Sequence, residues 1–173
     1  MTKKYNSVLI IGMGLIGSSI SRVLVENHVA NSVYGLDTND KIIKKCHDLN
    51  LLVQGETNLN NFDLQFDLII ICTPLSAYKN IFSSLSDFIS QPTLITDVGS
   101  TKMSTISDFK NAVTNNNITF VPSHPIAGLE KSGPEYGFSK LFDNRYCILT
   151  PYETNDAATS SISEMWKLSL IHI

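Results

Sequence analysis

Apolar residues are distributed along this chain in two patterns, and each pattern predicts a different kind of element. Short continuous apolar runs, bounded by turn-forming residues, predict buried strands. Longer segments in which apolar residues recur every three or four positions predict amphipathic helices. The predicted strands are residues 7–11, 32–37, 67–72, 92–98, 118–121 and 145–150. The predicted helices are residues 15–27, 41–49, 76–89, 103–113 and 155–166.

The order of these elements predicts the fold class. Strands that alternate with helices at this spacing form βαβ units with right-handed crossovers. We therefore expect an α/β fold that is Rossmann-like and doubly wound, with a mainly parallel sheet and helices on both faces. Three segments have a weaker pattern: residues 51–53 predict a short edge strand, 55–62 a polar loop, and 130–144 an ordered loop with a helical turn.

The junction between the first strand and the first helix carries the spacing Gly-x-Gly-x-x-Gly. Gly12 permits a tight turn, Gly14 lets a pyrophosphate approach the backbone, and Gly17 lets the helix pack closely on the strand. The unpaired amides at the start of the helix favour an anion. The motif predicts a dinucleotide site formed by Gly12, Met13, Gly14, Leu15, Ile16 and Gly17.

An acidic residue at the end of the second strand gives this glycine motif its context. Asp37 lies about 20 positions after the motif, where a carboxylate accepts hydrogen bonds from ribose hydroxyls. The same carboxylate repels a 2′-phosphate, so Asp37 favours NAD over NADP as the cofactor. The alternative, in which the glycines only form a structural turn, stays open.

Composition excludes several other classes of protein. The net charge of −3, without blocks of like charge, gives no basic surface for nucleic acid. The three cysteines, Cys46, Cys72 and Cys147, are widely spaced and fit no metal pattern. We expect them to be buried or half-buried free thiols in a reducing cytoplasm, with no bound metal.

The apolar N-terminal run predicts neither a membrane span nor a secretion signal. No stretch reaches the roughly 18 apolar residues that a transmembrane helix needs. Lys3 and Lys4 before the apolar run superficially resemble a signal peptide. Arg22 and Glu26 argue against one, because they continue the following helix with a polar face.

The residues that follow successive strands meet at the carboxyl edge of a parallel sheet, where ligands of such folds bind. Thr73 and Pro74 end one strand beside the glycine turn and extend the predicted cofactor site. Ser100 and His124 follow two later strands, where a nicotinamide and its substrate would meet. The sequence therefore places a hydroxyl and an imidazole at the reactive end of the cofactor.

His124 lies between Ser123 and Pro125, which predicts a constrained turn. An imidazole titrates near neutral pH, so it can accept a proton from a substrate hydroxyl as hydride leaves. Ser100 can donate to the substrate, hold the imidazole, or simply cap the following helix. We expect Lys102 to be a solvated lysine in the first turn of that helix rather than an anion contact.

The remaining histidines are expected to have no chemical role. His28 stands where the first helix ends and is interpreted as a solvated cap residue. His47 and His172 are interpreted as structural or exposed.

Several motifs together resemble the prephenate dehydrogenase family of tyrosine biosynthesis, over about residues 6–168. The motifs are Asp-Val-Gly-Ser-Thr-Lys at 97–102, His-Pro-Ile-Ala-Gly at 124–128 followed by Glu130, Ser132 and Gly133, Leu-Phe at 141–142, and Leu-Thr-Pro at 149–151. The histidine block is far more specific than the glycine motif. The resemblance implies oxidative decarboxylation of prephenate to 4-hydroxyphenylpyruvate with NAD⁺. An arogenate or cyclohexadienyl dehydrogenase and a non-catalytic NAD-binding fragment of the same fold are the alternatives.

The resemblance also implies roles for three residues. His124 corresponds to the histidine that hydrogen-bonds the ring hydroxyl of the substrate and takes its proton. Ser100 corresponds to the serine that contacts this histidine and the substrate hydroxyl near the nicotinamide. Glu130 corresponds to an acidic residue near the substrate entrance, and its alternative is a carboxylate at the start of a helical turn.

Two departures from the family pattern concern the end of the chain. The family continues into a helical dimerisation domain that forms a homodimer in the cytoplasm, and this domain is largely missing here. We expect residues 1–151 to form the NAD(P)-binding domain and residues 152–173 to begin the next region, which the apolar ending suggests is truncated. The family's arginine for a prephenate carboxylate has no clear replacement, and Arg145 is expected to be structural within a strand.

Overall fold

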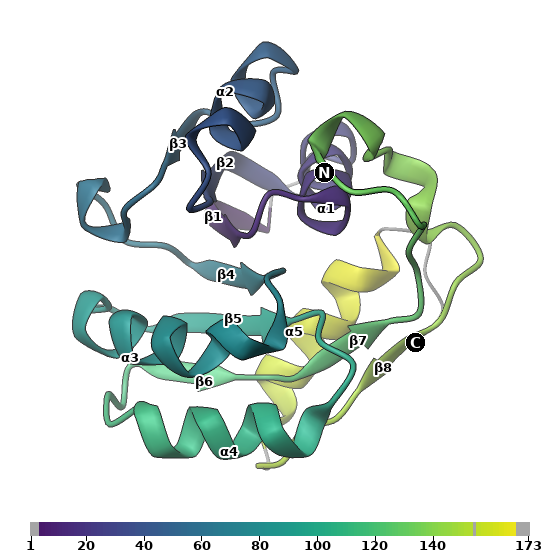
Figure 1. Cartoon of the computed structure of the whole chain (residues 1–173). Coiled ribbons are helices and arrows are strands. Elements are labelled where there is room, and N and C mark those ends of the chain that lie inside the picture. The colour runs from purple at the N-terminus through teal and green to yellow at the C-terminus, as the bar shows by residue number, and fades with distance from the viewer. Residues whose placement is uncertain (1–3, 154, 169–173) are drawn as a thin grey trace.

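The computed structural model describes residues 4–153 and 155–168 and contains a six-stranded sheet (Figure 1). The strand order is β3-β2-β1-β4-β5-β6, and every neighbouring pair is parallel. This is the doubly wound order that the sequence predicts. The strands are β1 (Tyr5–Ile11), β2 (Ala30–Leu36), β3 (Gln54–Glu56), β4 (Leu68–Ile71), β5 (Thr93–Asp97) and β6 (Ile118–Phe120).

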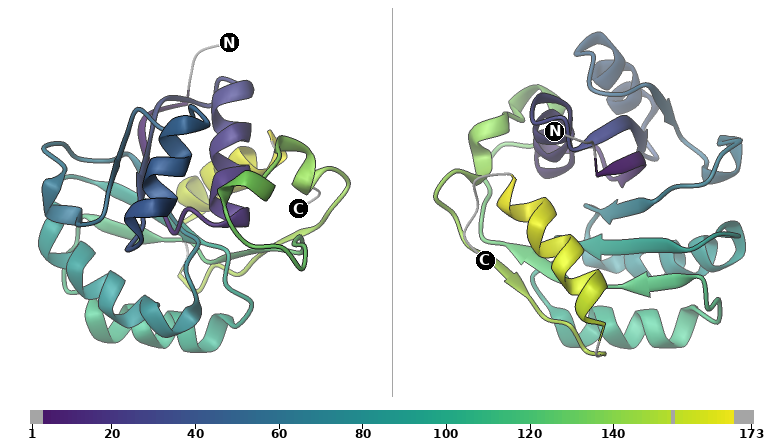
Figure 2. Two further views of the ribbon diagram at one scale, coloured as in Figure 1. Left: turned by 45° about the horizontal axis from the view of Figure 1, so that its top comes forward. Right: turned by 180° about the vertical axis from the view of Figure 1, so that it is seen from behind.

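Helices cover both faces of this sheet (Figure 2). The α-helices are α1 (Leu15–Glu26), α2 (Asp40–Asp48), α3 (Tyr78–Phe88), α4 (Lys102–Ala112) and α5 (Asp156–Lys167). Short 3₁₀ helices are η1 (Leu59–Asn61), η2 (Leu75–Ala77), η3 (Pro134–Tyr136) and η4 (Ser139–Phe142). Helices α1, α2 and α5 share one core, and α3 and α4 share the other.

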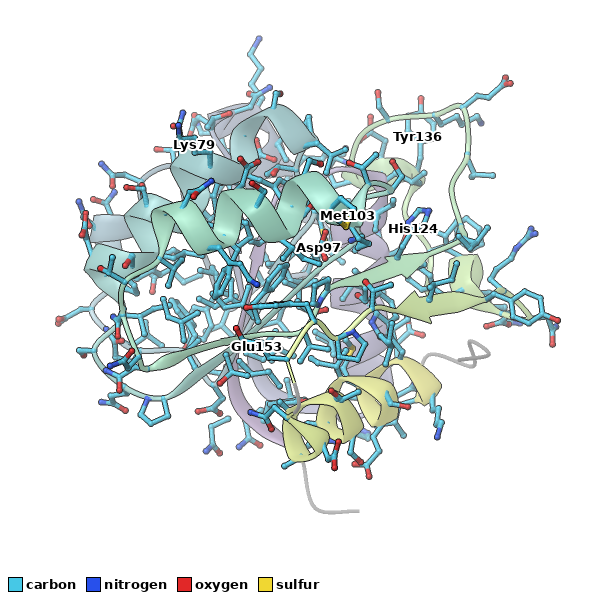
Figure 3. All side chains as sticks on the ribbon, turned by 90° about the horizontal axis from the view of Figure 1, so that it is seen from below. Lys79, Asp97, Met103, His124, Tyr136 and Glu153 are labelled. Carbon is cyan, nitrogen blue, oxygen red and sulfur yellow. The ribbon has the colours of Figure 1, made fainter. Side chains whose placement is uncertain are left out.

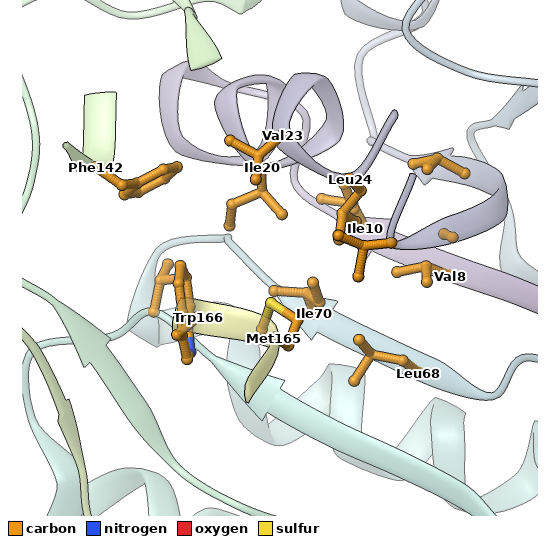
Figure 4. Close-up of a cluster of buried hydrophobic side chains, with 14 of the residues drawn as sticks. Val8, Ile10, Ile20, Val23, Leu24, Leu68, Ile70, Phe142, Met165 and Trp166 are labelled. Atoms are coloured by element: carbon orange, nitrogen blue, oxygen red, sulfur yellow. The ribbon is translucent and has the colours of Figure 1, made fainter. Parts of the chain in front are cut away.

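Strand β1 separates these two cores because successive side chains of a strand point to opposite faces. Val8 and Ile10 belong to the core under α1 (Figure 4), whereas Leu9 and Ile11 belong to the core under α3. All four are almost fully buried, which explains why the run is apolar throughout rather than alternating.

Helix α5 closes the core on the side of α1. Its Trp166 is fully buried and contacts the ring of Phe142 edge-on, with 5.7 Å between ring centroids (Figure 4). The domain boundary expected after residue 151 stays a prediction, and His172 lies outside the described residues. None of the described helices has the length and apolar character needed to cross a membrane.

Two predicted strands differ from the structure. The edge strand expected at residues 51–53 is instead β3, which begins at Gln54 and continues into the predicted loop, whereas Leu51 is buried in the core. The strand expected at 145–150 is only β8 (Cys147–Leu149), and it pairs antiparallel with β7 (Ser123–Pro125) outside the main sheet. Arg145 precedes β8 and is exposed, so its expected place within a strand is wrong.

The separate ribbon of β7 and β8 has a local cause. Val121 donates the last backbone bond to β5, at the carbonyl of Ile95. Pro122 has no N–H and cannot extend this ladder. The chain therefore leaves the sheet and starts a new pairing at Ser123.

The third predicted helix is also modified at its start. Its first residues form η2, and α3 begins only at Tyr78. The side chains that α3 buries are Tyr78, Phe82 and Leu85, whereas Ile81 and Phe88 are only partly buried. The apolar spacing of Ile81, Leu85 and Phe88 predicts one buried face, but of these three residues only Leu85 is fully buried in the core.

Candidate active site

The glycine turn between β1 and α1 has the geometry of a phosphate-binding loop. Gly12 has φ +93°, and a Cβ there would lie 2.8 Å from the carbonyl carbon of Cys72. A Cβ on Gly17 would overlap with the carbonyl oxygen of Gly12. At Gly14, by contrast, a Cβ would meet no atom within 4 Å. Gly12 and Gly17 are thus required by the fold, while Gly14 faces open space that a ligand can enter.

Gly14 is also the N-cap of α1, and no side chain caps this helix. The first backbone amides of the helix are therefore available to an anion, and the helix dipole favours one there.

Asp37 is fixed against the same turn. Its Oδ2 accepts a hydrogen bond from the Met13 amide at 2.9 Å, and its Oδ1 accepts one from the Asn39 amide at 3.0 Å. The carboxylate is half-buried and keeps further lone pairs for hydroxyl donors. This arrangement places a negative charge at the rim of the turn, directly after β2.

A cavity of about 740 Å³ lies next to Asp37 and the glycine turn. Gly12, Gly14, Asp37, Thr73 and Pro74 from the predicted cofactor set line it. The hydroxyl oxygen of Thr73 is buried with no hydrogen-bond partner among the described residues. A buried hydroxyl of this kind is costly unless it is paired, so the lining suits a polar ligand.

The other wall of this cavity was not predicted from the sequence. It consists of the N-cap residue of η1 and of residues from η1 and α3: Asn58, Leu59, Asn60, Asn80, Ile81, Ser84, Leu85 and Asp87. Residues 55–62 had only the polarity of a loop, and nothing in the sequence pattern indicates that they lie opposite α3.

His124 lies on strand β7 directly opposite Ile148, so the predicted turn at this residue is wrong. Its side chain is half-buried, and Nδ1 is 3.2 Å from the carbonyl oxygen of Val98. Because a carbonyl only accepts, Nδ1 carries the hydrogen in this contact and Nε2 is left as the acceptor. The imidazole is thereby oriented for taking a proton at Nε2.

Ser100 is exposed in the loop after β5, and no hydrogen bond links it to His124 in the part of the chain that the structure describes. The alternative role as helix cap is wrong, because Thr101 is the N-cap of α4. Glu130 is exposed in a bend, and the next helical turn, η3, begins only at Pro134. The alternative for Glu130 is therefore also wrong, and the substrate roles of Ser100 and Glu130 stay predictions.

Lys102 is not the solvated lysine that the sequence suggests. Its side chain is only 13% exposed, and Nζ lies 2.6 Å from Asp97 Oδ2 and 2.6 Å from the Ser123 carbonyl oxygen. Burial raises the pKa of Asp97 and lowers the pKa of Lys102, and the attraction between the two charges opposes both shifts. Figure 3 shows Asp97 and His124 near Met103, which lies in the first turn of α4.

Sequence reasoning missed the pairing of Asp97 with Lys102, although a signal was present. An aspartate at the end of a buried strand, as in residues 93–97, needs a partner when its side chain is fully buried. A lysine five positions later was the nearest candidate for that partner.

The cysteines and two of the other histidines lie where the sequence suggests. Cys46 and Cys147 are buried free thiols and Cys72 is a half-buried one, which confirms the expected burial and the expected free state of the thiols. His28 is exposed directly after the C-cap of α1, and His47 is exposed on α2.

The strand order, the glycine turn and the acidic residue after β2 define a Rossmann-type α/β domain. The family model of the prephenate dehydrogenase nucleotide-binding domain matches residues 20–173. The chain therefore belongs to the prephenate dehydrogenase family and represents its nucleotide-binding domain, as the sequence motifs predict.

Curated relatives have similar sequences. A cyclohexadienyl dehydrogenase of Zymomonas mobilis is 31% identical over 164 residues, which cover 94% of this chain and 55% of that protein. A prephenate dehydrogenase of Bacillus subtilis is 31% identical over 157 residues, covering 90% of this chain and 42% of that protein. The chain thus spans about half the length of these relatives.

Solved structures have the same fold. The prephenate dehydrogenase of Aquifex aeolicus in complex with hydroxyphenyl propionate and NAD⁺ matches with a TM-score of 0.90 and 30% identity, over 100% of this chain and 60% of that one. A Synechocystis arogenate dehydrogenase matches with a TM-score of 0.86 over 96% of this chain and 58% of that one. Its 22% identity supports a shared fold alone.

Proposed function

We propose that this chain binds NAD⁺ and forms the cofactor-binding half of a prephenate dehydrogenase. The observation that carries the proposal is the orientation of His124, whose Nδ1 contact with Val98 leaves Nε2 as a proton acceptor. This acceptor follows β6, and the glycine turn follows β1 in the same parallel sheet. A dinucleotide that extends along the carboxyl edge would bring its reactive ring towards the histidine.

The residues around the cavity fit NAD⁺ in particular. The glycine turn and the free amides of α1 would hold the pyrophosphate, and Asp37 would accept hydrogen bonds from the adenosine ribose. Thr73 and Pro74 would border the same part of the cofactor. The fixed carboxylate of Asp37 makes NADP the less favourable ligand, because a 2′-phosphate would approach a like charge.

The proposed chemistry assigns one proton, taken up and then returned, to the protein. His124 Nε2 would take the proton of the ring hydroxyl, and NAD⁺ would supply the hydride acceptor. Loss of CO₂ then makes the ring aromatic, and His124 would return the proton to the ring oxygen of the product. Because aromatisation supplies much of the driving force, the site mainly orients the reacting groups. The exposed hydroxyl of Ser100 would donate to the same substrate oxygen, and Glu130 would lie near the entrance.

The second candidate is activity on arogenate as well as prephenate. One relative carries the name cyclohexadienyl dehydrogenase, and one structural neighbour the name arogenate dehydrogenase. The two substrates differ in one group of the side chain, which is a keto group in prephenate and an amino group in arogenate. The proposed contacts of His124 and Ser100 are with the ring hydroxyl, so they do not distinguish the two substrates. Prephenate remains the first choice because two curated relatives bear the name prephenate dehydrogenase.

The proposed cellular compartment and oligomeric state are those that the family resemblance implies. We propose a cytoplasmic protein, consistent with three free thiols, whose full-length form is a homodimer. A non-catalytic NAD-binding role is the competing proposal for the chain by itself.

The purified chain should be mixed with NAD⁺ and either prephenate or arogenate, and NADH absorbance followed. We expect turnover of prephenate, and a His124→Asn variant that loses roughly a hundredfold or more in rate. The variant should bind NAD⁺ normally by calorimetry, because His124 does not line the cavity beside Asp37. NAD⁺ binding without turnover of either substrate would favour the non-catalytic role, and robust oxidation of a different hydroxy acid would contradict the proposal.

A further inference from the structure

The position of His124 is not set by the main sheet. The backbone ladder between β5 and β6 ends with the bond from Val121 to Ile95. Strand β7 pairs with β8 alone, so no backbone ladder fixes His124 against the loop after β5. Other contacts must hold these two segments together.

Ser123, the residue before His124, is held through each of its polar groups. Its amide donates to Asp97 Oδ1 at 3.1 Å, and its hydroxyl donates to the Asp97 carbonyl at 2.6 Å. Its own carbonyl accepts from Lys102 Nζ at 2.6 Å. Ser123 is fully buried, so each of these contacts is shielded from water.

The same carboxylate also holds the loop after β5. Asp97 Oδ2 accepts the amide of Gly99 at 3.0 Å, one residue before Ser100. One side chain therefore binds both segments that carry the candidate catalytic groups, and Lys102 neutralises it at 2.6 Å.

We propose that Asp97, with Lys102 as its counter-ion, is the positioning device of the candidate active site. The pair fixes Ser123, and through it His124, against Gly99 and Ser100. A buried ion pair is a weak source of stability compared with apolar packing, so its specific contribution here is geometry. Its consequence for catalysis rests on the function proposed above, whereas its effect on Ser123 is measurable without turnover.

The chain contains a direct reporter of Ser123. Trp166 is the only tryptophan, and its Nε1 donates to Ser123 Oγ at 3.1 Å. The indole N–H signal in a ¹H–¹⁵N NMR spectrum therefore reports the position of this serine and needs no assignment among other tryptophans. Amide exchange at Ser123 reports the bond to Asp97.

The test variant is Asp97→Leu with Lys102→Met, which removes the ion pair and the side-chain acceptor of the Ser123 amide without leaving one buried charge alone. The matched control is Asp40→Leu with Lys44→Met, an ion pair with side chains 62% and 73% exposed. We expect the test variant to stay folded, to shift the indole signal and to speed exchange of the Ser123 amide at least tenfold. Its NAD⁺ dissociation constant should stay within about twofold, and the control should resemble the unmodified chain.

Turnover provides the second measurement. Loss of positioning should lower kcat for prephenate by roughly ten- to a hundredfold with little change in KM for NAD⁺. If the unmodified chain turns over neither substrate, the proposed function fails, but the NMR measurements still judge the positioning role.

Two results would overturn the inference. One is a folded test variant whose indole signal and Ser123 exchange equal those of the unmodified chain. The other is a test variant with altered NMR signals but an unchanged kcat in an active chain. If this double variant does not fold, Asp97→Asn with Lys102→Met replaces it, because an asparagine still accepts from the Ser123 amide while the buried ion pair is absent. Its indole signal should shift in the same direction, and an unchanged signal would again contradict the proposal.

Discussion

His124 and Ile148 lie directly opposite each other in the antiparallel ribbon of β7 and β8. Directly opposite residues share a face of such a ribbon. The face of His124 is partly open to solvent, because Ile148 is 51% exposed, whereas the neighbouring pair Pro125 and Cys147 points to the buried side. The candidate histidine thus stands on a surface with exposed apolar neighbours.

This alternation predicts that substitutions at adjacent positions change the free energy of unfolding by very different amounts. Ile148→Thr, on the exposed face, should change the free energy of unfolding by less than about 0.5 kcal/mol. Cys147→Asp, on the buried face, should cost more than about 2 kcal/mol because it buries an unpaired carboxylate. Urea denaturation followed by circular dichroism measures both. Equal losses at the two positions would show that the ribbon faces are assigned wrongly.

The glycine turn predicts a separation of stability from binding. Gly12→Ala should destabilise the chain by more than about 1 kcal/mol, because residue 12 has a positive φ and contacts Cys72. Gly14→Ala should leave the unfolding free energy nearly unchanged but weaken NAD⁺ binding, since its free side faces open space. Thermal unfolding and calorimetry test the pair together. A Gly14→Ala variant that binds NAD⁺ with unchanged affinity would contradict the proposed path of the pyrophosphate.

Cofactor choice depends on Asp37 in the proposed complex. The unmodified chain should bind NAD⁺ more tightly than NADP⁺, and Asp37→Ser should narrow the difference. The serine also loses the bond to the Met13 amide, so we expect some loss of NAD⁺ affinity as well. Asp40→Asn, a nearby exposed carboxylate, serves as the control. Equal affinity of the unmodified chain for both cofactors would refute this role.

The buried thiol of Cys46 predicts a pH dependence of stability. Burial raises its pKa from 9.0 to about 11. Because the folded pKa lies above that of the unfolded thiol, this group contributes stability that is present below pH 9 and is lost as the pH rises towards 11. The unfolding free energy of Cys46→Ala should therefore fall less steeply over this interval than that of the unmodified chain. Parallel curves, measured by urea titration at successive pH values, would exclude the effect.

The main sheet could be predicted from the sequence because burial on both faces imposes a local pattern. Residues 68–71 are continuously apolar and lie in the centre of the sheet, with helices on either side. Asp37 was also predictable, because it follows from a fixed spacing after the glycines. The placement of these residues needs only information from neighbouring positions.

Pairings between distant segments were not predictable in the same way. Residues 147–149 have the composition of a strand, but nothing in them specifies an antiparallel partner outside the sheet. Lys102 resembles a solvated lysine because its burial depends on Ser123, 21 positions away. The substrate roles of Ser100 and Glu130 stay predictions, since both side chains are exposed.

The hydrogen bond between Asp37 and the Met13 amide has a consequence for the kinetics of ligand capture. This bond joins the glycine turn, which would bind the phosphates, to Asp37, which would bind the ribose, and it is present without a ligand. A preorganised binding site of this kind loses little conformational entropy when a ligand binds. We therefore expect association to proceed at a rate set mainly by diffusion and orientation, with differences in affinity among nucleotides residing in how long each remains bound.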